Sequence, residues 1–286
     1  VANKVSVITD STSSLNKDLV DKYNIGIVPI SIYSGGKVYR DWIDINPNEA
    51  YELFLKDPDD FTTSPSSPGQ FLEVFKRVGN YASGILCITL SSKLSTCYNI
   101  ACNAREKAKT ELPGITIEVL DSLNVTASEG FIALAAARAA DEGKNLDEVV
   151  KIASEVRDKA RFIILLDTIE HVYRTGRIPK IAARVGSALK IKPILTNASS
   201  GKVNFAGAVR NKEQGLERII KMMKLEVGDR PVHITVMHTY AKNEAEVLME
   251  RISGEFNHTE LFITEFSPVM GYACGTGALG FAFYPE

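Results

Sequence analysis

The sequence lacks the features that mark several large classes of protein. Only four cysteines occur in 286 residues, and none forms a Cys-x-x-Cys pair, which argues against a disulfide framework and a zinc ribbon. The longest apolar run, Phe131–Ala137, is too short to cross a bilayer. The net charge of −2 provides no overall positive field for nucleic acid. We therefore expect no cofactor, no metal, no nucleic-acid partner and no stable membrane insertion.

The sequence also begins without a charged segment followed by an apolar one, so we expect no signal peptide and a cytoplasmic protein. What is present is typical of a globular protein, with 45% hydrophobic and 24% charged residues. The length fits one large domain or two ordinary ones.

The first half alternates short β-rich segments with helical ones, which predicts a parallel sheet. The predicted strands are Lys4–Thr9, Ile25–Ile32, Ile85–Leu90 and Ile115–Leu120. The predicted helices are Leu15–Tyr23, Pro47–Lys56, a helix capped by Ser67 that runs to about Val78, Leu94–Lys109, Val125–Asp141 and Leu146–Lys159. Gly35-Gly36 is expected to turn a small hairpin between these elements.

The pattern changes after a strand at Arg161–Leu166, because two helical stretches, Thr168–Tyr173 and Ile181–Leu189, follow without a strand between them. The later strands are Lys192–Thr196, Val203–Ala208, Val232–His238 and Glu260–Thr264, and the later helices are Lys212–Lys224 and Glu244–Ser253. The first two of these strands are expected to form a hairpin. We predict an α+β domain with mixed or antiparallel pairing, and a domain boundary that separates residues 1–159 from 160–286.

Four strand ends of the first half carry polar residues that we expect to converge at one edge of the parallel sheet: Asp10-Ser11-Thr12, Thr63-Ser64, Ser91-Ser92 and Asp121-Ser122. Ligands of open parallel sheets bind at that edge, and free N–H groups with hydroxyls at helix starts bind anionic oxygens. Helix capping is the simpler explanation, and we favour it for Asp10 and Ser67. We favour ligand binding for Thr63, which precedes the cap, and for Ser95, which lies just inside a predicted helix start. The pattern indicates a site that holds an acidic group.

Three other features have ordinary explanations beside functional ones. Arg177 lies in a basic turn whose Gly176 is typical of a helix C-terminus, and Arg210, at a strand end, is equally explained as a solvated side chain. The GxGxxG pattern at Gly275–Gly280 follows no predicted strand, so close backbone approach explains it better than a dinucleotide site. The four histidines have no metal-ligand spacing.

In their order, the motifs resemble the DegV family, which includes the FakB-type fatty-acid-binding subunits of bacterial fatty acid kinase. The matching segments are Ile8–Thr12, Thr63-Ser64 with Ser67-Pro68-Gly69, Leu90–Ser95, Asp121-Ser122, Gly176-Arg177-Ile178, Lys190–Ile194 and Gly277–Gly280. The resemblance implies an α/β protein of two domains, an N-terminal Rossmann-like parallel sheet and a C-terminal α+β domain, with a long-chain fatty acid such as palmitate buried between them.

The resemblance also implies residue roles. The carboxylate is held by Thr63 and Ser95, with Ser64 and Thr96 beside them. A kinase subunit phosphorylates the presented carboxylate to an acyl phosphate that feeds phospholipid synthesis, and we assign Arg177 and Arg210 to the partner or phosphate side. The family's His-Thr-Gly-Pro-Gly is here Ala273–Gly277, so Ala273 replaces a histidine that supports the carboxylate end.

We therefore interpret the chain as a lipid-binding protein and not an enzyme. Burying about fourteen methylenes at ~0.8 kcal/mol each supplies on the order of 11 kcal/mol before ordering costs. One alternative is a serine hydrolase acting on a lipid ester, which needs a Ser–His–Asp constellation, although the sequence has no G-x-S-x-G elbow. Another is a binder of small phosphorylated molecules.

Overall fold

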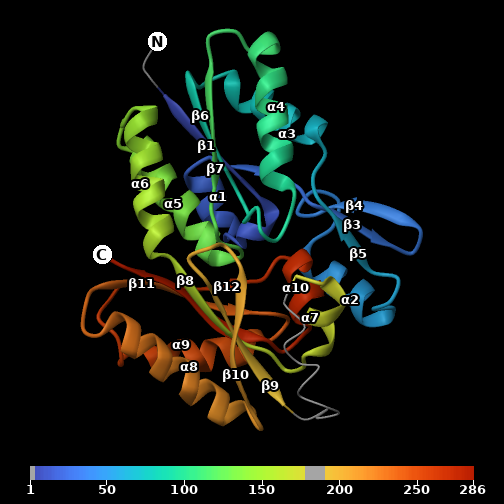
Figure 1. Ribbon diagram of the computed structural model, residues 1–286, viewed down its shortest axis with the longest axis vertical. Coiled ribbons are helices and arrows are strands. Elements are labelled where there is room, and N and C mark those ends of the chain that lie inside the picture. Colours follow the sequence, from blue (N-terminus) through green and yellow to red (C-terminus); the bar gives the residue numbers. More distant parts are fainter. Residues whose placement is uncertain (1–3, 178–190) are drawn as a thin grey trace.

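A computed structural model describes residues 4–177 and 191–286 (Figure 1). The helix predicted at Ile181–Leu189 lies outside the described residues, as do Ile178 and Lys190 of the quoted motifs.

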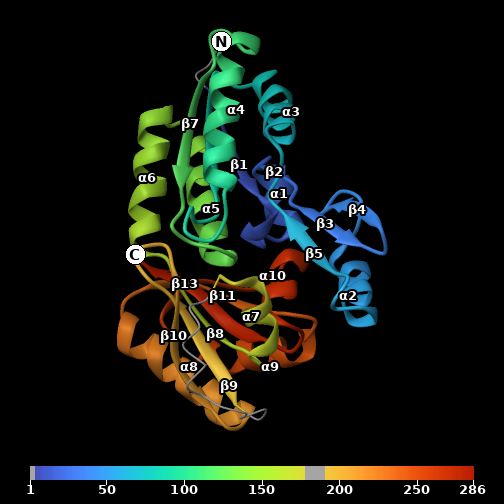
Figure 2. The same cartoon turned by 45° about the vertical axis from the view of Figure 1, so that its right-hand side comes forward.

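The N-terminal half is built on a parallel sheet with the strand order β2-β1-β6-β7, which confirms the predicted pairing. The strands are β1 (Val5–Asp10), β2 (Gly26–Val28), β6 (Gly84–Thr89) and β7 (Thr116–Asp121). The helices are η1 (Ser11–Ser13, a 3-10 turn), α1 (Lys17–Lys22), α3 (Pro68–Gly79), α4 (Cys97–Glu111), α5 (Ala127–Asp141) and α6 (Leu146–Lys159). Helices α3 and α4 cover one face of the sheet and α5 and α6 the other (Figures 1 and 2). The strand order reverses between β1 and β6, so the carboxyl ends of these two strands flank the usual ligand crevice.

A small antiparallel sheet with the order β4-β3-β5 projects from this half (Figure 2). It contains β3 (Ser31–Ser34), β4 (Lys37–Arg40) and β5 (Thr62–Ser64), and α2 (Pro47–Lys56) packs near it. Gly35 and Gly36, both at positive φ, form the predicted hairpin turn.

Two sequence expectations in this region were wrong. The single strand predicted over Ile25–Ile32 is divided between β2 and β3 at Pro29-Ile30. Pro29 has no N–H group for a ladder, and the N–H of Ile30 donates instead to Ser11 Oγ at 3.1 Å. Thr63 and Ser64 do not follow a parallel strand, because they belong to β5 itself.

The C-terminal half is built on a six-stranded sheet with the order β10-β9-β8-β13-β11-β12, antiparallel except for the parallel pair β11–β12. The strands are β8 (Arg161–Leu165), β9 (Lys192–Asn197), β10 (Val203–Val209), β11 (Val232–His238), β12 (His258–Glu265) and β13 (Leu279–Pro285). The helices are α7 (Glu170–Thr175), α8 (Lys212–Val227), α9 (Lys242–Ser253) and α10 (Pro268–Cys274). This arrangement confirms the predicted mixed sheet, although the sequence analysis missed α10 and the central strand β13.

The two halves share one apolar core. Helices α8 and α9 cover one face of the six-stranded sheet, and the other face meets α5 and α6 (Figure 1). Phe162 and Ile164 of β8 belong to the same buried cluster as Val5 of β1 and Phe131 of α5. Helix α5 is buried along most of its circumference, as expected for an alanine-rich helix between two sheets.

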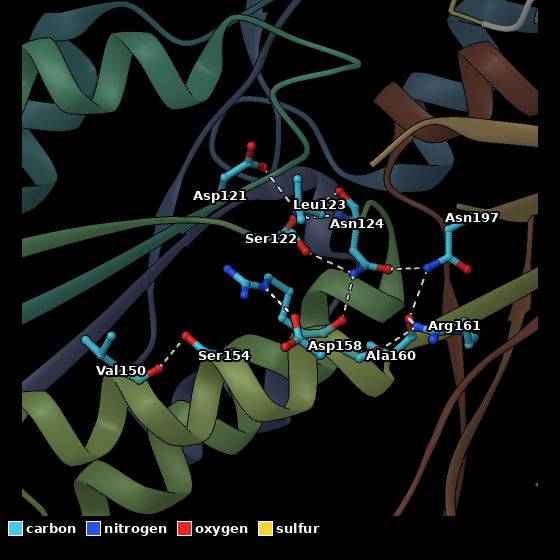
Figure 3. Close-up of polar contacts among 11 residues, drawn as sticks. Asp121, Ser122, Leu123, Asn124, Val150, Ser154, Asp158, Ala160, Arg161 and Asn197 are labelled. Carbon is cyan, nitrogen blue, oxygen red and sulfur yellow. Dashed lines mark hydrogen bonds and ion pairs between the residues drawn. The ribbon is translucent and has the colours of Figure 1, made fainter. Parts of the chain in front are cut away.

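Polar contacts also join the halves at the start of β8 (Figure 3). The Asn197 side chain of β9 donates to Asn124 Oδ1 at 2.8 Å and to the carbonyl of Ala160 at 3.0 Å, and it accepts the N–H of Phe162 at 2.9 Å. Asn124 in turn donates to the carbonyl of Ser122, just after β7. The side chain of Asn197 therefore ties the loop beyond the parallel sheet to the first strand of the second sheet.

Candidate functional site

A cavity lies between the two sheets. The empty space between its wall atoms is about 880 Å³, which includes open solvent at its mouth. Most of the wall is apolar: Ile30, Leu90, Leu94, Val125, Phe162, Ile164, Val172, Leu195, Val203, Val269 and Met270. Residues of both halves contribute, so the site depends on their packing against each other.

Hydroxyl groups interrupt this apolar wall on the side of the N-terminal half. Thr12, Thr63, Ser64 and Ser95 all line the cavity. Three of the predicted sheet-edge segments do converge here, because Asp10 Oδ2 accepts the N–H of Leu90 at 2.9 Å, and Asp121 Oδ1 accepts the N–H of Ser92 at 3.1 Å. The sequence analysis named the segment that contains Thr12 but did not select Thr12 as a site residue.

Strand β5 brings Thr63 and Ser64 to the cavity. Thr63 pairs with the buried Ile32 of β3, whereas the preceding Thr62 is exposed. The hydroxyl of Thr63 makes no hydrogen bond to the rest of the described chain, which leaves it available to a ligand. The expected cap is also found nearby: Ser67 Oγ accepts the N–H of Gln70 and completes a capping box for α3.

Ser95 lies on the loop before α4, not inside a helix start as the sequence analysis expected, because the N-cap of α4 is Thr96. Its hydroxyl oxygen accepts the N–H of Cys97 at 3.3 Å, and it lies 3.3 Å from Cys97 Sγ. Ser95 lines the cavity, whereas Thr96 is exposed and is absent from the lining. Ser64 and Ser95 therefore join Thr63 at the cavity, and Thr96 does not.

The neighbouring Ser91 has a structural role. Its buried hydroxyl donates to the carbonyl of Gly201 at 2.7 Å, in the turn between β9 and β10. A Cβ atom at Gly201 would lie 2.5 Å from Ser91 Oγ, so the contact between the halves requires glycine there.

The two arginines occupy different environments. Arg177 lines the cavity, is exposed, and donates through Nη1 to the carbonyl of Thr175 at 2.5 Å. It is the one charged side chain among the described residues of the cavity wall. Gly176 has a φ of +67° directly after α7, as expected for a helix C-terminus. Arg210 is exposed after β10 and is absent from the cavity lining.

Helix α10 closes another side of the cavity with Tyr272, Ala273 and Cys274, of which only Ala273 had been singled out from the sequence, by the family resemblance. Burial raises the pKa of the Cys274 thiol to about 12, so it remains protonated. Ala273 presents a methyl group to the cavity, so it provides no hydrogen-bond donor at this point of the wall.

The GxGxxG segment connects α10 to β13, and close packing explains its glycines. A Cβ atom at Gly275 would lie 2.4 Å from His171 Cδ2, and one at Gly277 would lie 2.5 Å from Asp167 Oδ2. Both glycines have positive φ. The strand–glycine loop–helix context of a dinucleotide site is absent from this described segment, as the sequence analysis expected.

Buried carboxyl groups lie behind the hydroxyl side of the wall. Burial, with a smaller contribution from the charge of Asp10, raises the pKa of Asp41 to about 7. Burial also raises the pKa of Asp10, against hydrogen bonds from Thr12 and Leu90. Among the described residues, no group of three or more His, Cys, Asp or Glu side chains is arranged to hold a metal ion. No helix in the described part of the chain is both long and apolar enough to cross a membrane.

Comparison with known sequences gives a match over nearly the whole chain. A family model described as "Uncharacterised protein, DegV family" matches residues 4–286. A DegV domain-containing protein of Clostridium acetobutylicum is 33% identical over 287 residues, covering 99% of this chain and 98% of that protein.

Solved structures are similar over the same extent. The structure titled "Fatty Acid Binding of a DegV family Protein from Thermus thermophilus" is 27% identical, with a TM-score of 0.88, and covers 99% of this chain and 100% of its own. The structure of DegV from Bacillus subtilis, titled as a fatty acid binding protein, is 25% identical, with a TM-score of 0.88 and full coverage of both chains. The agreement in motifs, fold and coverage leads to one conclusion: this chain belongs to the DegV family.

Proposed function

We propose that this protein binds one long-chain fatty acid in the cavity between its two sheets. The observation that carries the proposal is the cavity itself, whose mostly apolar wall carries the hydroxyl groups of Thr12, Thr63, Ser64 and Ser95 on the side of the N-terminal half. Two similar proteins whose structures cover this whole fold are described as fatty acid binding.

The apolar wall accounts for the affinity. Side chains from β8, β9 and the loops beyond β1 and β6 line the cavity, so an acyl chain placed there exchanges water for apolar contacts. A tail of about fourteen methylenes contributes on the order of 11 kcal/mol, from which the cost of ordering the ligand is subtracted.

Thr63, Ser64 and Ser95 account for the preference for an acid. Hydroxyl donors to a carboxylate form charge-assisted hydrogen bonds, which are stronger than neutral ones. The free hydroxyl of Thr63 and the partly exposed hydroxyl of Ser95 are the best placed of these donors. Thr96 is exposed outside the wall, so we no longer include it among the ligand-binding residues.

We further propose that the bound acid is presented to a kinase subunit for phosphorylation. Arg177 supports this assignment, because an exposed guanidinium on the cavity wall suits an anionic group near the mouth. Arg210 is exposed outside the wall, where it can contact a partner without touching the lipid. No observation on the described residues favours the serine hydrolase alternative.

The test is a titration of delipidated protein with palmitate and with hexadecanol, which has the same tail without the charge. Thr63→Ala and Ser95→Ala each remove a charge-assisted hydrogen bond worth roughly 1.5–3 kcal/mol, so each should weaken palmitate binding about tenfold or more. Hexadecanol affinity should change much less. Thr62→Ala is the matched control, because Thr62 is the exposed neighbour on the same strand. Palmitate binding by the double Ala variant that equals the parent's would refute the assignment.

A further inference from the structure

Two fully buried carboxyl groups, Asp10 and Glu129, meet at the hydroxyl of Thr12. Thr12 Oγ1 lies 2.5 Å from Asp10 Oδ1 and 3.1 Å from Glu129 Oε2. The first contact is shorter than a normal hydrogen bond, and the second is a long one. A threonine hydroxyl carries a single proton, so it can donate to only one of these two carboxyl groups. The other contact is a hydrogen bond only if a carboxyl group supplies the proton.

The remaining contacts decide which carboxyl group that is. Asp10 accepts two backbone N–H groups, from Thr12 at 3.0 Å and from Leu90 at 2.9 Å, and neither contact can be reversed. Asp10 therefore has the environment of a carboxylate that accepts three hydrogen bonds. The hydroxyl groups beside Glu129 are those of Thr12 and of Thr9, whose Oγ1 donates to Oε1 at 3.0 Å, and its carboxyl group also faces that of Asp10. A hydroxyl can accept as readily as it donates, so this environment suits a protonated acid.

The electrostatics agree with this assignment. Burial raises the pKa of Glu129 well above its usual value, and the nearby charge of Asp10 raises it further, against hydrogen bonds from Thr9 and Thr12. Asp121 of β7 also raises the pKa of Glu129. Glu129 occupies the first turn of α5, where the helix dipole favours a negative charge, but burial in this cluster outweighs that effect.

We propose that Glu129 is a neutral acid that donates its proton to Thr12, and that the chain Glu129–Thr12–Asp10 positions the hydroxyl side of the cavity wall. Asp10 holds η1 through Thr12 and the loop after β6 through Leu90, and both Thr12 and Leu90 line the cavity. Because Glu129 is neutral, only Asp10 of this pair carries a negative charge near an anionic ligand. These three residues are positioning residues for a carboxylate ligand, and their link to that ligand rests on the proposed function.

The first experiment locates the proton without a ligand. The infrared difference spectrum between the parent and Glu129→Gln at pH 7 should contain the carbonyl stretch of one protonated carboxylic acid; Asp41, whose pKa is about 7, absorbs in both proteins and cancels in this difference. Glu118→Gln, which removes an exposed carboxylate on β7, is the control and should leave the band unchanged. A difference spectrum without this band, or the same band in the difference between the parent and Glu118→Gln, would overturn the assignment of the proton.

The second experiment tests the positioning role. Glutamine keeps a donor for Thr12 and an acceptor for Thr9 without the charge, so Glu129→Gln should bind palmitate within about twofold of the parent. Thr12→Val interrupts the chain and should weaken binding about tenfold.

The dependence on pH provides a further readout of the same idea. Affinity in the parent should fall in alkaline solution as Glu129 ionises beside Asp10, and in Glu129→Gln this fall should be absent. Loss of affinity in Glu129→Gln equal to that in Thr12→Val would overturn the positioning role of a neutral acid. If the parent binds no palmitate, the proposed function fails, and the infrared comparison still decides where the proton lies.

Discussion

Replacing Asn197 by alanine should destabilise the protein by about 3 kcal/mol, because its side chain makes three hydrogen bonds at the junction of the two halves (Figure 3). A hydrogen bond of this kind contributes about 1 kcal/mol to folding. The substitution leaves the N–H of Phe162 and the amide of Asn124 without these partners.

Equilibrium unfolding in urea measures this loss as a lower midpoint with an unchanged slope. Asn204→Ala is the matched control, because Asn204 is exposed on the adjacent strand β10 and pairs there with Thr196 of β9. Asn124→Ala combined with Asn197→Ala should cost less than the sum of the single changes, since one hydrogen bond is shared. A loss below about 0.5 kcal/mol for Asn197→Ala, no larger than that of the control, would refute the reasoning.

Three further predictions concern presentation of the ligand and pH. Ala273→His should raise acyl phosphate formation by a cognate kinase more than it raises palmitate affinity, because the added donor stabilises the growing charge; equal turnover in both proteins would contradict this. Arg210→Ala should weaken kinase docking in a pull-down assay with lipid affinity nearly unchanged, and the reverse pattern would move Arg210 to the lipid site. Burial, with a smaller effect of Lys242, lowers the pKa of His238 from 6.5 to about 4. Between these pH values, the unfolded chain binds a proton at His238 that the folded protein does not bind. The free energy of unfolding should therefore fall by on the order of 3 kcal/mol as the pH drops from 6.5 to 4. His238→Gln should reduce this fall, whereas His258→Gln, at an exposed site, is the control and should leave it unchanged.

The parallel sheet and the mixed sheet could be predicted from sequence because each depends on local patterns. Val5–Asp10 and Gly84–Thr89 are short apolar strands next to helices with clear starts, and the capping boxes at Ser67 and Asn145 mark two of those starts. Strand β13 was missed because its first residues, Leu279 and Gly280, fall within the glycine-rich segment Gly275–Gly280. Its central place in the sheet is set by pairing with β8 on one side and β11 on the other.

The candidate site could be predicted only in part, because local patterns mark some of its residues and distant contacts place the others. Thr63 and Ser95 stand out as hydroxyls beside helix starts, and both reach the cavity. The positions of Thr12 and Glu129 depend on a contact between residues more than one hundred positions apart, which no local pattern indicates. Tyr272 and Cys274 likewise reach the cavity through the packing of α10 against α2 and α7. The domain boundary near residue 159 and the role of Arg210 stay predictions.

The most direct test of the central claim is native mass spectrometry of the purified protein, before and after delipidation and addition of palmitate. The account predicts one bound species with the mass of a long-chain fatty acid, its loss on delipidation, and the return of a single ligand when palmitate is added. A protein that is empty as purified and takes up no palmitate at saturating concentration would contradict it.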